Sequence, residues 1–391
     1  MSSDTVVDSN MNSSKRESGL AVPDEALCPH IEDMESSVKQ MLKVNYGLTM
    51  TSLKQLNGYD DLNLHVKTEP EYSNSHIDAH HPEGFFLKIL NVNDSRRPEL
   101  MYAQRSLMDH IISKGIVCQE AIRGINGEVF TEITSPNTKG EKVTYLVSLR
   151  NFLPGRVMAD CRLTAGLLYN LGSYTAKIID ALQDFSHPYY ETFDPLWNLS
   201  NLSKVSEVTF AVKEEEKRKL SEDVIKQFET QVLPNRHTLR KGQIHGDINE
   251  NNILVDDVCS DSRVPQFTGL LDFQDSAYSY TVYDISLCIS YMLMFGKSDV
   301  PQLEIPGHIL AGYNSIVELT PAEKRVLRIC IAARMVMSLV YGAYTYHMDP
   351  SNEYVLETSR FGWQALTQFW AADEQKMQDG WDEIVKSYKS N

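Results

Sequence analysis

The sequence predicts an α+β fold with two lobes, a small N-terminal lobe built on an antiparallel sheet and a larger helical C-terminal lobe. Three observations lead to this prediction. The chain has 391 residues, which is long for a single hydrophobic core. Before residue 150, several apolar segments have the length and alternation of strands, and beyond residue 155 apolar residues recur at helical spacing. We therefore expect an N-lobe over residues 26–150 and a C-lobe over residues 151–391.

The first 25 residues differ in composition from the rest of the chain. They are rich in Ser, Asn and Asp and contain no apolar segment of the kind found in a signal peptide. Because they offer little apolar surface to bury, we expect residues 1–25 to form a disordered tail. The first expected helix covers about residues 31–45.

The strands of the predicted N-lobe sheet are separated by polar turns. Leu53–Leu56 precede a turn-like segment at 57–61, and apolar residues then alternate from Leu62 to Val66, which indicates two strands joined by a tight loop. "FFLKILNV", residues 85–92, and "VTYLVSLRN", residues 143–151, predict two more strands. A helix is expected between them, near residues 98–114.

The C-lobe begins with a clear helical period. "LTAGLLYNLGSYTAKIIDAL", residues 163–182, and the charged segment 214–232 both predict amphipathic helices. A hairpin is expected to follow Asn252 and return through "RVPQFTGLLDF", and the chain from 282 onward is predicted to be mostly helical.

Charge and cysteine content narrow the class of protein. The formal net charge is −16 and the pI about 5.1, which argues against a nucleic-acid partner and suits a cationic small-molecule ligand. The six cysteines include no C-x-x-C pair, so we expect reduced thiols in a cytoplasmic protein. No membrane association is expected, because the segment 285–296 is too short to span a bilayer and the longer apolar segment contains Arg334.

The most informative stretch is "QIHGDINENNILVDD", residues 243–257, which has the pattern H-x-D-x-x-x-x-N before a short apolar strand. In phosphoryl transfer, an Asp on a loop orients the acceptor hydroxyl, and an Asn and a second Asp hold Mg²⁺. Asp247 is therefore the candidate catalytic base. Asn252 and Asp272, the latter at the end of the expected return strand, are the candidate metal ligands. A turn with a helix cap would explain "HGD" alone, but it would not explain the whole pattern.

A phosphate-binding lysine should then lie on a strand of the N-lobe. Lys88 stands among apolar residues in "FFLKIL", where a charge is costly unless it is paired. The alternative is an edge lysine whose ammonium reaches solvent. "NGYDDLN", residues 57–63, would be the phosphate loop, with Gly58 and Asn63 at the turn, although it lacks G-x-G-x-x-G.

These motifs together resemble the aminoglycoside phosphotransferase and choline kinase-like family, which has the two-lobe protein-kinase-like fold. Within that family the resemblance is to the kinases of 5-hydroxylysine, through "YDDLNLHV", "FFLKI", "YLVSLRNFLPGR", "HGDINENNIL", "LLDFQDSAYSY" and "GHILAGY". It covers about residues 45–390. It implies transfer of phosphate from GTP, or alternatively ATP, to the 5-hydroxyl of a small amino-acid substrate with Mg²⁺ as cofactor.

The resemblance also implies roles for individual residues. Asp247 would be the base, Asn252 and Asp272 the magnesium ligands, and Lys88 the contact to the α- and β-phosphates. Asp284 in "VYDIS" would steady the catalytic loop.

Further roles follow from the resemblance in the same way. His245 would support the catalytic loop. Residues 147–150, and so Ser148 and Arg150, match the linker that meets the nucleotide base.

The sequence departs from the family pattern at the partner of the strand lysine. The kinase-like fold pairs this lysine with a glutamate on the next helix. The aligned position here is Tyr102, so Glu99, one turn earlier, becomes the candidate. A second departure is Gln274, which stands where a glycine is common.

Two alternatives remain open at this stage. A choline, ethanolamine or homoserine kinase would share the H-x-D motif but should lack "YDDLN". A nucleotide-binding pseudokinase would fit the missing glutamate at position 102, but it would not need Asp247, Asn252 and Asp272 all to be intact.

Overall fold

In the computed structural model, the N-terminal lobe is a five-stranded antiparallel sheet with the strand order β1-β2-β3-β5-β4. The structure describes residues 30–58, 61–136, 140–256, 264–348, 350 and 353–389, so the tail predicted over residues 1–25 lies outside the described residues. The strands are β1 Leu48–Leu56, β2 Leu62–Tyr72, β3 Phe85–Ile89, β4 Thr131–Pro136 and β5 Lys142–Asn151. The helix expected over 31–45 is α2, Met34–Met41, which continues as a wider turn to Tyr46.

The two faces of this sheet have different characters. Leu64 of β2 and Leu87 of β3 are fully buried in the core on one face. Asn63 of β2, Lys88 of β3 and Ser148 of β5 are cross-strand partners and share the opposite face. Because side chains alternate along a strand, the apolar pattern of one face places this polar row on the other.

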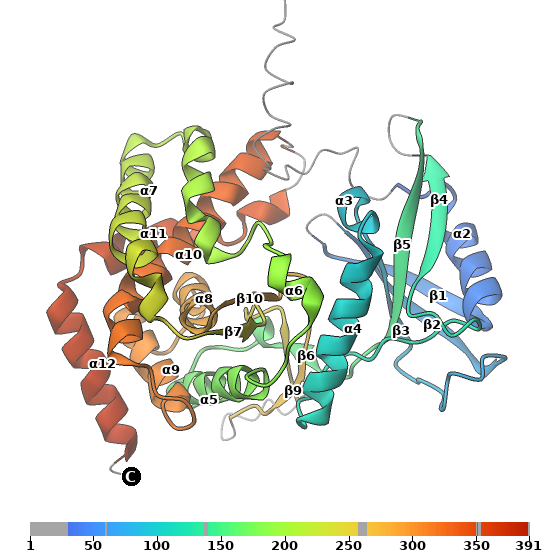
Figure 1. Ribbon diagram of the computed structural model, residues 1–391, viewed down its shortest axis with the longest axis horizontal. Coiled ribbons are helices and arrows are strands. Elements are labelled where there is room, and N and C mark those ends of the chain that lie inside the picture. The colour runs from blue at the N-terminus through green and yellow to red at the C-terminus, as the bar shows by residue number, and fades with distance from the viewer. Residues whose placement is uncertain are drawn as a thin grey trace, which may run out of the picture.

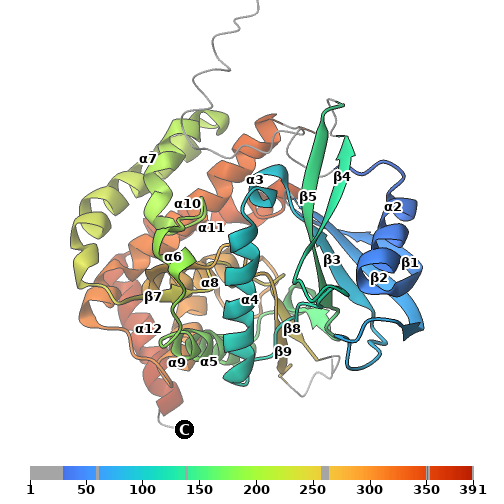
Figure 2. The same ribbon diagram turned by 45° about the vertical axis from the view of Figure 1, so that its right-hand side comes forward.

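The second face looks toward the rest of the molecule. α4, Pro98–Ser113, lies between the sheet and the C-terminal lobe (Figure 1 and Figure 2). It follows the short helix α3, Val92–Ser95. The polar row of the sheet therefore borders the junction of the two lobes.

The C-terminal lobe is mainly helical, as predicted. Its helices are α5 Ala165–Ala181, α6 Pro188–Thr192, α7 Glu215–Gln227, α8 Thr281–Met294, α9 Ile305–Tyr313, α10 Pro321–Met348, α11 Ser359–Ala371 and α12 Glu374–Lys389. A 3₁₀ helix covers Leu199–Ala211. α10 is long and apolar enough to cross a membrane, but 94% of its most apolar window is buried within the protein, as in the core helix of a globular lobe.

Two small sheets carry the functional loops of this lobe. One pairs β7, Lys241–Ile244, with β10, Ala277–Tyr280. The other has the order β6-β8-β9, where β6 is Arg156–Val157, β8 Ile253–Val255 and β9 Phe267–Leu270. The hairpin expected after Asn252 is β8–β9, and its prediction is confirmed.

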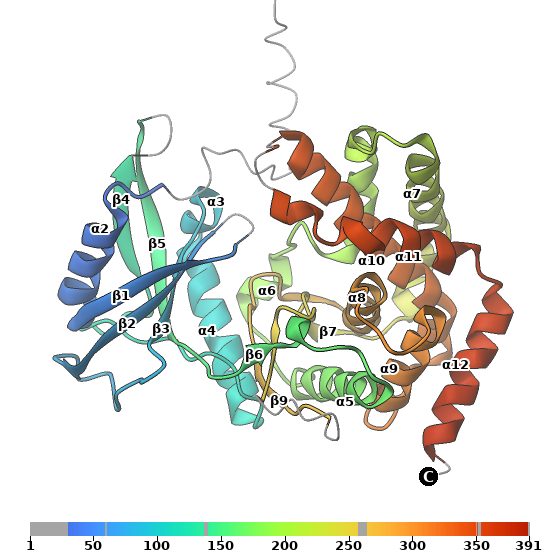
Figure 3. The ribbon, with the colours of Figure 1, turned by 180° about the vertical axis from the view of Figure 1, so that it is seen from behind.

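The helices of the C-terminal lobe pack closely, and the contact between α5 and α9 depends on two glycines (Figure 3). A Cβ atom on Gly172 would lie 1.8 Å from the carbonyl oxygen of Ile309, and one on Gly312 would lie 1.8 Å from that of Tyr169. Each helix therefore presents bare backbone to the other, which no residue with a side chain could do.

Candidate active site

A buried carboxylate, that of Asp284, binds the backbone of the turn that follows β7. Asp284, in the first turn of α8, accepts hydrogen bonds from the backbone N–H groups of His245 at 2.9 Å and Gly246 at 2.8 Å. Gly246 has φ +85°, and a Cβ there would lie 2.2 Å from the carbonyl oxygen of Asp275. Burial raises the pKa of Asp284 to about 6, although the two N–H donors oppose that rise. The turn before Asp247 thus has a fixed backbone.

His245 ties this turn to the segment that carries Asp272. Its ring is fully buried, with Nε2 3.1 Å from the carbonyl oxygen of Leu271, and its Nδ1 accepts from the N–H of Asp247 at 3.2 Å. Burial lowers the pKa of His245 to about 4, so the ring is neutral at neutral pH. An Nδ1 that accepts and an Nε2 that faces a carbonyl define the Nε2–H tautomer.

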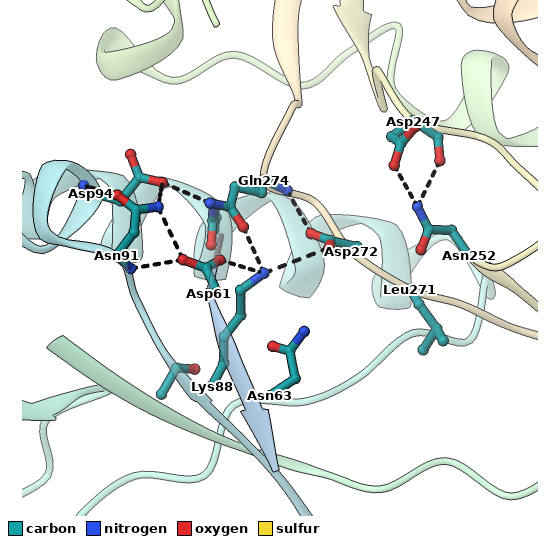
Figure 4. Close-up of polar contacts among 12 residues, drawn as sticks. Asp61, Asn63, Lys88, Asn91, Asp94, Asp247, Asn252, Leu271, Asp272 and Gln274 are labelled. Carbon is teal, nitrogen blue, oxygen red and sulfur yellow. Dashed lines mark hydrogen bonds and ion pairs between the residues drawn. The ribbon is translucent and has the colours of Figure 1, made fainter. Parts of the chain in front are cut away.

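Asp247 is oriented by two neighbours, of which Figure 4 shows Asn252. The Asn252 amide nitrogen donates to a carboxylate oxygen of Asp247 at 2.7 Å and to its carbonyl oxygen at 3.0 Å. The Arg334 guanidinium, from α10, lies 3.5 Å from the other carboxylate oxygen. Burial raises the pKa of Asp247, and the charge of Arg334 and the bond from Asn252 oppose this rise. A carboxylate with a raised pKa and an oriented oxygen is suited to accept a proton.

Asp272 lies on the neighbouring segment, which follows β9. The backbone N–H of Leu271 donates to the carbonyl oxygen of Asn252 at 2.8 Å, which holds the two segments together. Asp272 has φ +56°, a conformation that Asp and Asn adopt more readily than most residues. Its side chain is 41% exposed. Partial burial raises the pKa of Asp272, but the cations of Lys88 and Arg150 outweigh this effect and lower it, so the carboxylate is ionised.

Asn252 and Asp272 together offer the oxygen atoms that Mg²⁺ prefers. Because the Asn252 nitrogen is bound to Asp247, its amide oxygen points away from that residue (Figure 4). Among the described residues, no group of three or more His, Cys, Asp or Glu side chains is arranged to hold a metal ion. One carboxylate and one amide still fit Mg²⁺, since this ion usually takes one or two protein ligands and completes its shell with phosphate and water.

Lys88 lies across the lobe junction from these ligands. Its ammonium lies 3.0 Å from the carboxylate of Asp61 and 3.5 Å from that of Asp272, and it donates to Oε1 of Gln274 at 2.6 Å (Figure 4). Burial alone lowers the pKa of Lys88, but the carboxylates of Asp272 and Asp61 outweigh it and raise the pKa. Lys88 is therefore a buried, charged lysine and not an edge residue.

The prediction of Glu99 as the acidic partner of Lys88 is wrong. Glu99 is exposed in the first turn of α4, and the aligned Tyr102 is 45% exposed and donates to Glu128 at 2.8 Å. Asp61 pairs with Lys88 instead, from the connection between β1 and β2, and its side chain is only 3% exposed. The sequence did not indicate this role, because Asp61 lies in the polar segment 57–63, which has the composition of an ordinary turn.

Ser148 and Arg150 also lie elsewhere than predicted. Both belong to β5, where their Cα partners on β3 are Lys88 and Phe86, and both side chains are buried. Arg150 donates to Ser148 Oγ at 3.2 Å and to Gln104 Oε1 at 3.4 Å. Because this backbone is used for strand pairing, residues 147–150 are not the linker. The connection between the lobes follows β5, from residue 152 to 155.

Gly58 and Asn63 lie on either side of the connection between β1 and β2, Gly58 after the first strand and Asn63 at the start of the second. Asn63 Nδ2 donates to the carbonyl oxygen of Asn57 at 2.9 Å. A Cβ on Gly58 would lie 2.5 Å from the carbonyl oxygen of Asp61, so this tight turn requires glycine. Residues 59–60 of the expected phosphate loop lie outside the described residues.

Comparison with known proteins identifies the family of the chain. Residues 68–312 match the phosphotransferase enzyme family. The chain belongs to this family. It is 33% identical to the hydroxylysine kinase of Xenopus laevis, covering 90% of this chain and 94% of that protein, and 31% identical to the hydroxylysine kinase of Bos taurus, covering 93% and 95%.

A solved structure supports the same fold. The amicoumacin kinase hAmiN, in complex with AMP-PNP, Ca²⁺ and Ami, aligns with a TM-score of 0.59 at 15% identity over 85% of this chain and 93% of that one. The phosphotransferase described here therefore has the protein-kinase-like fold, as the sequence predicted. It is a small-molecule kinase with an alcohol group as acceptor, and the pseudokinase alternative is set aside.

Arg334 is a second residue of this phosphotransferase that sequence reasoning missed. It is 2% exposed, and its guanidinium donates to the carbonyl oxygen of Trp197 at 2.8 Å and lies over that ring. With Trp197, Asn198 and Asp275 it lines a small cavity beside the turn at Gly246. Its signal in the sequence is an arginine inside the apolar segment 329–344 of α10, where a buried charge requires a partner.

Glu250, three residues after Asp247, gives a prediction on pH. It is buried, its Oε2 has no hydrogen-bond partner among the residues that the structure describes, and burial raises its pKa from 4.5 to about 7. Asp247 and Glu357 raise this pKa further, and Lys297 opposes them. A raised pKa favours the folded state below pH 4.5, and this contribution is lost as the pH rises through 7.

Glu250→Gln should therefore be as stable as the wild-type phosphotransferase near pH 4.5 and more stable above pH 7, by about 3 kcal/mol in the free energy of unfolding. Denaturant unfolding of both proteins at several pH values measures the difference. A difference that does not change with pH would contradict a raised pKa of Glu250.

Proposed function

We propose that this phosphotransferase transfers the γ-phosphate of GTP to the 5-hydroxyl of 5-hydroxy-L-lysine, with Mg²⁺ as cofactor. The observation that carries the choice of substrate is the similarity to two hydroxylysine kinases, at 31% and 33% identity over nine-tenths of the chain. Acceptor chemistry differs between branches of one fold, so fold alone would not support this choice.

In this proposal Asp247 accepts a hydrogen bond from the 5-hydroxyl and takes its proton as the phosphate is transferred. The bond from Asn252 fixes one carboxylate oxygen, and the raised pKa of Asp247 favours proton acceptance. The guanidinium of Arg334 forms an ion pair with the second carboxylate oxygen of Asp247 at 3.5 Å. The Asp247 carboxylate thus needs little reorganisation to orient the acceptor.

Lys88, Asn252 and Asp272 serve the nucleotide in this proposal. Asn252 and Asp272 hold Mg²⁺, which neutralises charge on the phosphates, and Lys88 binds phosphate oxygens as a point charge. The lowered pKa of Asp272 and the raised pKa of Lys88 support these roles, because both groups stay ionised.

A product assay tests the proposed substrates. The purified protein is incubated with hydroxylysine, choline, ethanolamine or homoserine, each with GTP and with ATP, and phosphorylated product is measured. We expect hydroxylysine with GTP to give the highest kcat/KM. Phosphorylation of choline or homoserine without that of hydroxylysine would overturn the substrate assignment but not the kinase chemistry.

Lysine, which lacks only the acceptor hydroxyl, should act as a weak competitive inhibitor. It keeps the ammonium and carboxylate groups of hydroxylysine but cannot bond to Asp247. A hydrogen bond to a charged group contributes about 1.5–3 kcal/mol, so lysine should bind roughly ten- to a hundredfold more weakly than hydroxylysine. Competition titrations at fixed GTP measure the ratio. Equal affinities would show that Asp247 does not hold the hydroxyl in the ground state.

A further inference from the structure

Gln274 connects the two lobes through both ends of its side-chain amide. Its Oε1 accepts from the ammonium of Lys88 at 2.6 Å, and its Nε2 donates to a carboxylate oxygen of Asp94, on α3, at 2.6 Å. Its backbone N–H also donates to Oδ1 of Asp272 at 3.1 Å. Figure 4 shows the amide between Lys88 and Asp94, with Asp272 on the other side. One residue of the C-terminal lobe therefore contacts two residues of the N-lobe, Lys88 on β3 and Asp94 on α3.

The geometry around Lys88 explains why such a bridge matters. An ammonium has three donors. Asp61 at 3.0 Å and Gln274 at 2.6 Å take two of them, and the third faces Asp272 at 3.5 Å. When Asp272 binds metal, the third donor is left for a phosphate oxygen. Asp61 and Gln274 thus set the direction in which Lys88 presents its charge.

The far end of the bridge is also fixed. Asp94 accepts from Asn91 Nδ2 at 3.0 Å, and the same Asn91 amide donates to Asp61 at 3.0 Å. The Asp94 side chain is 15% exposed, and its second oxygen is 3.6 Å from Arg97, which is 46% exposed. Lys88, Gln274, Asp94, Asn91 and Asp61 therefore form a closed ring of polar contacts. Removing one member would take one polar contact from each of its two neighbours in a largely buried place.

We propose that Gln274 is a positioning residue, which holds Lys88 in the orientation for nucleotide phosphate by bridging it to Asp94. In many kinases a glutamate on the helix after the lysine strand orients this lysine. Here α4 supplies no such partner, because Glu99 is exposed and Tyr102 is bonded to Glu128. Gln274 and Asp61 orient Lys88 instead. A glycine at position 274 could make neither side-chain bond. The inference rests on the proposed function only in assigning Lys88 to the nucleotide.

The first test is direct binding of a non-hydrolysable Mg²⁺–nucleotide to the full-length protein by calorimetry, without an acceptor. Gln274→Met keeps the length of the side chain and loses both polar groups. We expect its nucleotide affinity to fall about tenfold, the scale of one hydrogen bond to a charged group. The KM for the acceptor should stay close to wild type. Unchanged nucleotide affinity in Gln274→Met would overturn the proposal.

A double-mutant cycle then separates the bridge from a local packing effect. Asp94→Ala should weaken nucleotide binding in the wild-type background and have little further effect in Gln274→Met, because the bond it makes is already gone. Arg97→Ala removes the cation that faces the second oxygen of Asp94 and serves as the matched control, with nucleotide affinity unchanged in both backgrounds. Independent, additive effects of Asp94→Ala and Gln274→Met would show that the amide does not act through Asp94.

A second variant, Gln274→Glu, tests the proposal if Gln274→Met is less stable than the wild type. It keeps an acceptor for Lys88 but sets a carboxylate oxygen against Asp94, so nucleotide binding should weaken. Adding Asp94→Ala should restore part of the affinity, which a purely structural role of Gln274 would not produce. Further loss in this double variant would count against the proposal. Since GTP and ATP analogues are both titrated without acceptor, a wrong substrate assignment leaves this test intact.

Discussion

Asp247→Asn should lower kcat by roughly 10²–10⁴-fold, the range that general-base groups contribute, while the protein still binds nucleotide. The variant keeps the size of the side chain and loses its basicity. An amide at this position must also turn its NH₂ group toward either Asn252 or Arg334, and both of these are donors. Orientation of the acceptor is therefore lost together with the base.

Single-turnover kinetics and calorimetry distinguish the two parts of this prediction. Phosphate transfer should be slow at saturating nucleotide, and nucleotide affinity should stay close to wild type. Asp109→Asn is a suitable control, because Asp109 is a half-exposed aspartate paired with Arg105 on α4, on a helix that does not supply Asp247. Substantial turnover by purified Asp247→Asn would assign the base elsewhere.

Asp272→Asn should lower kcat/KM by roughly 10²–10³-fold, the loss seen when one group that stabilises developing charge is removed. Its effect should differ in kind from that of Asp247→Asn, because it should weaken nucleotide binding that depends on Mg²⁺. The carboxylate faces Lys88 at 3.5 Å, and its lowered pKa keeps it charged for a cation. An amide has no such charge to offer.

Asparagine is the better substitution here because Asp272 has φ +56°. Asn accepts this backbone conformation, whereas Asp272→Ala adds backbone strain to the loss of a metal ligand. Nucleotide titrations at several Mg²⁺ concentrations measure the effect. If both variants require the same Mg²⁺ concentration as the wild type, the metal does not bind at Asp272.

The fold could be predicted where elements carry their own apolar pattern. α5 and the β8–β9 hairpin lie where the period and the turn residues indicate them. β4 was missed, because "TEITSP" has one large apolar residue, Ile133, and the strand is stabilised by its pairing with β5. β7 and β10 have only four residues each and were missed for a related reason. Short strands depend on partners that a local pattern does not contain.

The site was predictable to the extent that its residues follow from local motifs. Asp247 and Asn252 are five residues apart on one loop, and Asp272 comes two residues after β9, the return strand of the hairpin that begins after Asn252. The partner of Lys88 was not predictable in this way. Asp61 reaches it from a loop 27 positions earlier, and the neighbouring strands β2 and β3 bring them together. The prediction of Glu99 relied on a helix position that faces solvent here.

The location of Asp61 has a consequence for control of activity. In protein kinases the ion pair between the strand lysine and a helix glutamate makes activity depend on where that helix sits. Here the carboxylates that reach Lys88, among the parts of the chain that the structure describes, come from the β1–β2 connection and from Asp272. An outward swing of α4 would therefore break no ion pair of Lys88 among the described residues, and the charge of this lysine is paired independently of the position of that helix.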